Sequence, residues 1–187
     1  ASEGATLIYG FKNKISKDEF KQAIESNTLL DKLNVVSIKK GDTLFIEAGT
    51  VHAIGKGALI AEIQQNSNCT YRVYDYGRIG KDGKPRELHI DKAVDVSNTV
   101  PPKYDIKPMG EEIKHEGYTS QVLTKCDLFS VDRYDIADKI TLSAAKDSFN
   151  HVLVINGKGK INGRAAKKGD SFLIPAGYGE YIISGKA

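Results

Sequence analysis

Near the start of the chain, the spacing of hydrophobic residues changes from that of a β-strand to that of a helix. Alternating β-branched and aromatic residues predict a strand at Thr6–Phe11. Ser16 and Glu19 form a capping box, in which each side chain satisfies a free amide at a helix start. Apolar residues then follow at helical spacing, and Thr28 is a candidate cap for a second short helix. We therefore expect a helical insertion at about residues 16–33.

Further patterned stretches of the first half predict strands, a turn and a helix. In the longest of the strands, alternation would place Glu62 and Gln64 on one face. The expected strands are residues 35–38, 43–46, 58–65 and 70–76, with a turn at 66–68 and a short helix at 88–96.

The second half of the chain is rich in β-strand patterns, punctuated by turn dipeptides such as Asn156-Gly157 and Asn162-Gly163. The expected strands are residues 118–123, 128–134, 140–142, 151–155, 160–162, 171–175 and 181–184. Short strands at this spacing are typical of a small antiparallel sandwich or barrel. Residues 97–103, which contain Pro101-Pro102, are expected to be the interdomain linker.

An internal repeat indicates two copies of one small domain. Residues 39–49 read KKGDTLFIEAG and residues 167–177 read KKGDSFLIPAG, and seven of these positions are identical. So wide a separation does not suit a solenoid. After the shared turn and strand the copies diverge, because the first continues to His52 and the second to Glu180. This pattern favours one active copy and one structural copy.

Composition narrows the class of protein. The chain of 187 residues is 40% hydrophobic and 27% charged, which is ordinary for a globular protein. Its net charge of +3 is small, and lysines alternate with acidic residues, which argues against a nucleic-acid partner. No apolar run is long enough to span a membrane. Cys69 and Cys126 match no metal-binding spacing, and a reducing cytoplasm is the default location.

The first copy of the repeat carries a family resemblance. The pattern G-D-x-x-x-I-x-A-G-x-x-H at residues 41–52 resembles the second motif of the cupin β-barrels, and residues 49–78 and 84–93 resemble type I mannose-6-phosphate isomerase. The likeness is specific over residues 1–98 and weaker afterwards. It implies a mainly β protein with two cupin-like antiparallel β-barrels or jelly rolls. Residues 1–98 would be an incomplete catalytic domain, and residues 99–187 a second, non-catalytic domain.

The resemblance also implies a chemistry, the zinc-dependent interconversion of mannose 6-phosphate and fructose 6-phosphate. His52 corresponds to a zinc ligand of the family, and Arg72 to its active-site arginine, which would hold an oxyanion or a phosphate. Glu62 is the candidate for proton transfer, while Gln64 and Lys84 are candidates for substrate contact.

Each candidate residue has a purely structural alternative. A lone histidine is more often hydrogen-bonded structure, and Arg72 could pair with Asp75 or Glu62 as an ion pair. Gln64 and Lys84 suit a barrel wall or a surface equally well. The resemblance over the whole run is what favours the functional roles of His52 and Arg72.

The other zinc ligands of the family are not matched in this sequence. A catalytic zinc takes about three protein ligands, and no histidine precedes Lys39. We therefore expect the carboxy-terminal part of a longer enzyme, inactive alone and partnered by the missing part or by another copy of the chain. A non-catalytic sugar-phosphate-binding cupin and a purely structural module remain the alternatives.

Overall fold

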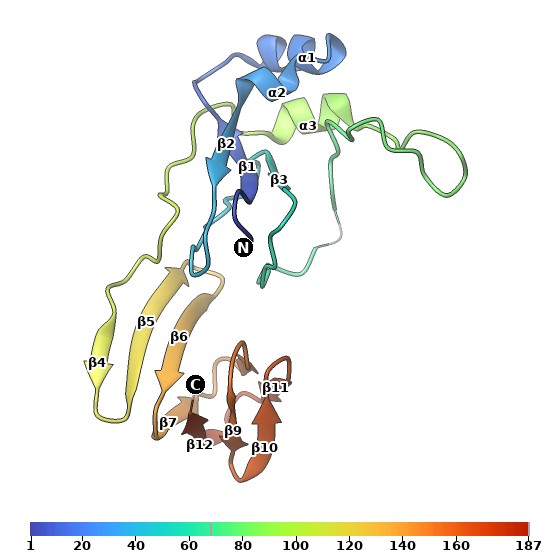
Figure 1. Cartoon of the computed structure of the whole chain (residues 1–187). Helices are drawn as coiled ribbons and strands as arrows, with labels where there is room; N and C mark the ends of the chain where they lie inside the picture. Colours follow the sequence, from blue (N-terminus) through green and yellow to red (C-terminus); the bar gives the residue numbers. More distant parts are fainter. Residues whose placement is uncertain (68, 187) are drawn as a thin grey trace. The chain divides into compact units, whose positions relative to one another are not determined.

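The computed structural model describes residues 1–67 and 69–186, which form two compact units, residues 1–107 and 108–187. The structure is mainly β, and its paired strands are antiparallel (Figure 1). Each unit is described by itself below. The predicted domains, residues 1–98 and 99–187, stay a prediction, and the predicted turn at 66–68 includes Asn68, which lies outside the described residues.

The first unit is built on one three-stranded sheet with β1 at its centre, in the order β2-β1-β3. Three helices lie together at one end of this unit (Figure 1). The strands are β1 (Thr6–Phe11), β2 (Leu33–Ser37) and β3 (His52–Ile54), and the helices are α1 (Lys17–Glu25), α2 (Leu29–Lys32) and α3 (Ile90–Val96). The strand at 6–11, the helical insertion and the helix within 88–96 are thereby confirmed.

The capping box predicted for α1 is present. The Glu19 amide donates to Ser16 Oγ over 3.1 Å, and the Ser16 amide donates to the Glu19 carboxylate over 2.7 Å. These bonds favour the ionised form of Glu19 and lower its pKa below the usual value. Thr28 lies at the N-cap position of α2, as predicted, but its side chain makes no capping bond.

The insertion forms the hydrophobic core of the first unit. The Phe11 and Phe20 rings are fully buried and meet edge to face, with their centroids 5.1 Å apart. Leu29 of α2 and Leu33 of β2 belong to the same buried cluster. Burial of large apolar side chains is the main stabilising term in small domains, so α1 and α2 hold one face of the sheet in place.

Three of the strands predicted for the first unit do not form. Residues 43–46, 58–65 and 70–76 are irregular in the described part of the chain. A strand needs a neighbouring strand to accept and donate backbone hydrogen bonds, and these stretches have none among the described residues. The predicted strand at 35–38 is confirmed and begins earlier, at Leu33.

The second unit contains every strand predicted for it, together with β4 and β10, which the pattern missed. Its sheets have the orders β4-β5-β6, β10-β9-β12-β7 and β11-β8. The strands are β4 (Ile113–His115), β5 (Tyr118–Lys125), β6 (Ser130–Ile136), β7 (Lys139–Ala144), β8 (Asn150–Leu153), β9 (Lys158–Ile161), β10 (Arg164–Lys167), β11 (Ser171–Ile174) and β12 (Gly179–Lys186).

Buried apolar side chains from several of these strands form the core of the second unit. Tyr181 of β12, Ile161 of β9 and Ile174 of β11 lie in one cluster. No sheet closes on itself within the described residues, so the arrangement as barrels stays a prediction.

The predicted linker is not a free connection. The Thr99 carbonyl accepts a hydrogen bond from the Ile15 amide over 2.9 Å. Tyr104 packs edge to face on Phe45, and both residues belong to the first unit. Residues 97–103 therefore pack within the first unit, although their prolines had suggested a linker.

The repeat detected in the sequence is a structural repeat. The Lys39 amide donates to the Asp42 carboxylate over 2.9 Å, and the Lys167 amide donates to the Asp170 carboxylate over the same distance. The glycines within both turns have positive φ angles. The sheet orders β2-β1-β3 and β10-β9-β12 also correspond, and α1 and α2 stand where the second copy has its tight turn between β9 and β10.

The capping box yields a stability prediction. Replacing Ser16 by alanine removes the bond to the Glu19 amide and is expected to lower the free energy of unfolding of the first unit by about 1 kcal/mol. Urea unfolding measures it. Thr28→Ala is the matched control, because Thr28 makes no capping bond and its replacement should cost clearly less. Equal losses in the two variants would contradict the assignment.

Candidate active site

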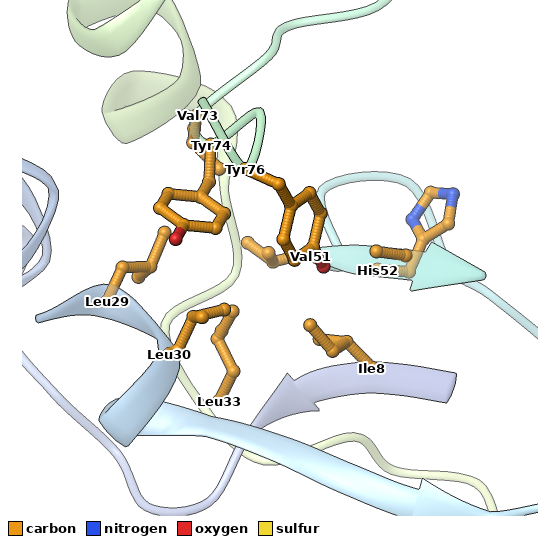
Figure 2. A pocket seen from close by; sticks show the side chains of 10 residues that line it. Ile8, Leu29, Leu30, Leu33, Val51, His52, Val73, Tyr74 and Tyr76 are labelled. Carbon is orange, nitrogen blue, oxygen red and sulfur yellow. The ribbon is translucent and has the colours of Figure 1, made fainter. Parts of the chain in front are cut away.

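One small pocket lies on the helix side of the first sheet. Its walls are mainly apolar and come from β1, β3, α2 and the irregular stretch at residues 73–76 (Figure 2). Its volume of about 50 Å³ is close to that of one or two water molecules. Pockets for small-molecule ligands have volumes of roughly 300 Å³ or more. This pocket is therefore a gap in the packing and too small for a sugar phosphate.

His52 begins β3 and is one of the residues that line the pocket, although its imidazole points away from the apolar wall. His52 is paired with Tyr9 of β1 and Ala53 is paired with Ile8, and directly paired residues share a face. Figure 2 shows the His52 ring turned away from Leu29 and Tyr74, which line the pocket. The His52 side chain is itself exposed and lies at the edge of the pocket.

The His52 ring is oriented by the chain that precedes it. Its Nδ1 lies 2.9 Å from the Thr50 carbonyl oxygen. A carbonyl only accepts, so Nδ1 carries the proton in this bond, and the neutral ring then keeps its lone pair on Nε2. A histidine whose other nitrogen is held by a carbonyl is the usual form of a metal ligand in proteins. The local geometry therefore suits the role that the sequence assigned to His52.

Tyr9 shares this face of the sheet and is almost fully buried. Its hydroxyl donates to the Phe45 carbonyl oxygen over 2.7 Å, which ties the irregular stretch at 43–46 to β1. Burial and the negative charge of Glu47 raise the pKa of the Tyr9 hydroxyl above its usual value. Tyr9 is therefore a structural donor that stays protonated.

Arg72 is held by a local network of its own. Its amide donates to His89 Nδ1 over 3.2 Å, its carbonyl accepts from the His89 amide over 2.7 Å, and its guanidinium donates to the Glu87 carbonyl over 3.1 Å. The alternative in which Arg72 pairs with Asp75 is not what the structure shows. The Asp75 carboxylate instead accepts two hydrogen bonds from the Arg86 guanidinium, one at each oxygen. The sequence analysis missed this ion pair.

The remaining candidates lie in irregular, exposed parts of the first unit. Glu62 and Gln64 are exposed within a stretch that forms no strand, so the expected sharing of one strand face does not apply. Lys84 belongs to a turn in which its carbonyl accepts from the Gly80 amide over 2.7 Å. Within residues 1–67 and 69–186, no hydrogen bond or ion pair joins any two of the five candidates.

The described residues do not make a zinc site by themselves. A catalytic zinc needs about three protein ligands, and no group of three His, Cys, Asp or Glu side chains is gathered at one point in the part of the chain that the structure describes. His52 is one suitable donor. Cys69 and Cys126 are both free thiols, but neither is part of such a group.

His89 is the residue at this site that sequence reasoning did not single out. It precedes α3, accepts from the Arg72 amide and lies beside Tyr71, with ring centroids 6.1 Å apart. The only signal for it in the sequence was its place inside the run at residues 84–93. Its role in the structure is to hold Arg72 against the start of α3.

Comparison with known proteins identifies relatives of this chain. Residues 119–187 match the family model described as mannose-6-phosphate isomerase, cupin domain. The mannose-6-phosphate isomerase ManA of Bacillus subtilis is 39% identical over 98% of this chain and 58% of its own length. The chain is thus related to the mannose-6-phosphate isomerases. This relationship confirms the resemblance and extends it into the second half, where the sequence analysis found it weaker.

Solved structures agree with this relationship. The crystal structure of the mannose 6-phosphate isomerase from B. subtilis superposes with a TM-score of 0.86 at 35% identity, over 99% of this chain and 59% of that one. A putative mannosephosphate isomerase from Archaeoglobus fulgidus shares the fold at 16% identity, with a TM-score of 0.58. The fold is that of the cupins. The chain spans somewhat more than half the length of the relatives it matches.

The isomerase of Streptococcus mutans is another such relative, 35% identical over 94% of this chain and 55% of its own length. No helix within the described residues has the length and apolar character needed to cross a membrane.

The pair formed by Asp75 and Arg86 yields a pH prediction. The Arg86 guanidinium lowers the pKa of the Asp75 carboxyl, which is 9% exposed. A lowered pKa means that the pair stabilises the fold above the usual aspartate range, near pH 4, and that this stabilisation is lost as the pH falls through the lowered value. Arg86→Met should therefore lower the free energy of unfolding at pH 7, and the difference should shrink in acid.

Urea unfolding at a series of pH values measures this difference. Lys21→Met is the control, because the Lys21–Asp91 pair is more exposed, at 44% and 86%, and should contribute little at any pH. A loss for Arg86→Met that does not depend on pH would mean that packing, not the ion pair, is responsible.

Proposed function

We propose that this chain carries part of the active site of a sugar-phosphate isomerase that interconverts mannose 6-phosphate and fructose 6-phosphate. The support is the 39% identity to a mannose-6-phosphate isomerase over nearly the whole chain. It is joined by the geometry of His52, whose Nδ1 is held by the Thr50 carbonyl while its side chain is exposed. The single observation that carries the proposal is the hydrogen-bonded orientation of the His52 imidazole in a chain that is related to mannose-6-phosphate isomerases.

The reaction class explains which groups are needed. Moving a proton between neighbouring carbons passes through an enediol, which requires a positioned acid/base and a positive centre beside the developing oxyanion. In this proposal Glu62 moves the proton, and Arg72 holds the oxyanion or the phosphate. Gln64 and Lys84 contact the sugar phosphate. These roles require the stretches at 58–65 and 70–76 to become ordered beside His52.

The proposal assigns zinc to the assembled site only. When bound, zinc would supply the positive centre, with His52 as the ligand from this chain and the other ligands from residues outside it. This assignment agrees with the absence of any three-residue ligand group from the described residues. The chain alone is therefore proposed to be inactive.

A non-catalytic role as a sugar-phosphate-binding or structural cupin is the second candidate. Two observations favour the structural role in particular, the small apolar pocket and the separation of the five candidate residues into unconnected local networks. The two functions differ in whether turnover appears when the site is completed.

The decisive experiment measures isomerase activity before and after completion. The chain is assayed alone and after addition of the part of the B. subtilis relative that lies outside its match to this chain. The chain alone should show no turnover, and the mixture should. His52→Ala should reduce the activity of the mixture by roughly 100-fold or more. His151→Ala, an exposed histidine of β8 in the second unit, is the matched control and should change it little. A well-folded mixture without turnover would favour the non-catalytic role.

Zinc binding gives an independent prediction. With one suitable donor, this chain alone should bind zinc weakly and lose it to a mild chelator, because a single ligand gains little of the affinity of a complete site. A competition titration with a coloured chelator measures this. Tight binding of one zinc per chain, abolished by His52→Ala, would contradict the proposed division of ligands.

A further inference from the structure

The second unit contains nearly the same local sequence twice, at its two Asn-Gly turns. Residues 155–158 read INGK, and residues 161–164 read INGR. The first turn lies between β8 and β9, and the second joins β9 to β10. Asn156 and Asn162 are both exposed. Because their neighbours in the chain and their access to water are alike, a difference in reactivity between these two asparagines has to come from what each side chain contacts.

The side chain of Asn162 is held at both of its polar atoms. Its Oδ1 accepts from the Ile182 amide over 2.7 Å, and its Nδ2 donates to the Tyr178 hydroxyl over 3.0 Å. The Asn162 amide also donates to the Ile182 carbonyl over 2.9 Å. The Asn162 carboxamide is therefore fixed against β12 and Tyr178, and turning it away breaks two hydrogen bonds.

Asn156 makes no comparable contact. In the described part of the chain, neither its side chain nor the amide of Gly157 takes part in a hydrogen bond. Gly157 is bonded through its carbonyl, which accepts from the Lys168 amide over 3.0 Å. Since Gly157 has no Cβ, the side chain before it can approach its nitrogen without a clash. Asn156 thus has a carboxamide that is free to turn, beside an amide nitrogen that is neither bonded nor hindered.

These are the features that deamidation of an asparagine requires. The Gly157 nitrogen attacks the side-chain carbonyl carbon of Asn156 and closes a cyclic imide. The carboxamide nitrogen leaves as ammonia and carries away the proton that the Gly157 nitrogen gives up. Water then adds to either carbonyl of the ring and opens it, which leaves an aspartate or, with the backbone passing through the former side chain, an isoaspartate. The reaction consumes water and needs no oxidant, reductant or cofactor.

We propose that Asn156 is a site of spontaneous deamidation in the folded chain, and that the hydrogen bonds to Ile182 and Tyr178 protect Asn162 from the same reaction. The proposal goes beyond the isomerase role and does not depend on it, because the reaction involves only the turn itself and water.

The product changes the connection between β8 and β9. The Gly157 carbonyl holds the Lys168 amide, and the Val154 carbonyl holds the Gly169 amide over 2.8 Å, so this connection is bonded to the turn of the repeat. An isoaspartate at position 156 lengthens the backbone between these two carbonyls by one carbon atom. The two bonds then lose their geometry, and amide exchange at Lys168 and Gly169 should become faster.

Peptide mapping by mass spectrometry after incubation in mildly alkaline buffer tests the proposal. In the folded chain, deamidation of Asn156 should be roughly 10-fold faster than that of Asn162 or more, since two hydrogen bonds have to break at Asn162. In urea the two rates should agree, because the local sequences are nearly identical. Aspartate and isoaspartate should both appear at position 156, and the isoaspartate shows that the imide was formed.

A matched pair of variants tests the protection of Asn162. Tyr178→Phe removes the hydroxyl that accepts from Nδ2 and should speed deamidation at Asn162 by roughly 3-fold or more. The rate at Asn156 should stay the same. Tyr118→Phe is the control, because the Tyr118 ring stacks on His115, and it should change neither rate. Unchanged exchange of the β12 amides shows that both variants are folded.

Equal rates at the two asparagines in the folded chain would overturn the proposal, and so would a faster reaction at Asn162. Aspartate without isoaspartate at position 156 would mean direct hydrolysis of the carboxamide, in which the Gly157 amide has no part. An unchanged rate at Asn162 in Tyr178→Phe would contradict the protection. Unchanged exchange at Lys168 and Gly169 in the isoaspartate form would contradict the expected effect on the turn.

Discussion

The structure of the first unit depends on one constraint, that every strand must find backbone partners. β1 meets it on both sides, through β2 and β3, and lies at the centre of the sheet. The stretches at 58–65 and 70–76 were predicted to be strands but have no partner among the described residues, and they are irregular. An unpaired strand gains no hydrogen bonds in return for its lost conformational freedom. The supply of partners, and not the local sequence, therefore decides which parts of this unit are ordered.

The two copies of the repeat show how the supply of partner strands changes the structure of nearly the same sequence. Residues 39–49 and 167–177 share seven positions and the same turn, yet only the second copy forms a strand, β11, beyond the turn. The difference cannot come from β propensity, because Thr43–Ile46 is as rich in β-branched and aromatic residues as Ser171–Ile174. It comes from β8, which pairs with β11 in the second copy and has no counterpart among the described residues of the first.

This explains which parts of the fold could be read from the sequence. The capping box at Ser16 and the hydrophobic pattern of β1 depend on neighbours a few residues away, so both were predicted correctly. The candidate site was predicted less completely. His52 was expected just past a strand at 43–46, but that strand does not form and His52 begins β3, which was not predicted. The bond from Arg72 to His89 and the pair of Asp75 with Arg86 join residues on different irregular stretches. Sequence patterns carry no information about such contacts.

The main hydrophobic core and the His52 side chain lie on opposite faces of the first sheet. Ile8 and Val51 face the core formed by α1 and α2, whose burial of Phe11 and Phe20 supplies the apolar stabilisation that this small sheet needs. The opposite face carries His52, and its ring remains exposed. The second copy has the tight turn at Asn162 in place of these helices, and its core lies between its own strands. The helical insertion therefore places the main core of the first unit on one face of its sheet, while the face of His52 is covered at Tyr9 by residues 43–46 and leaves the imidazole itself exposed.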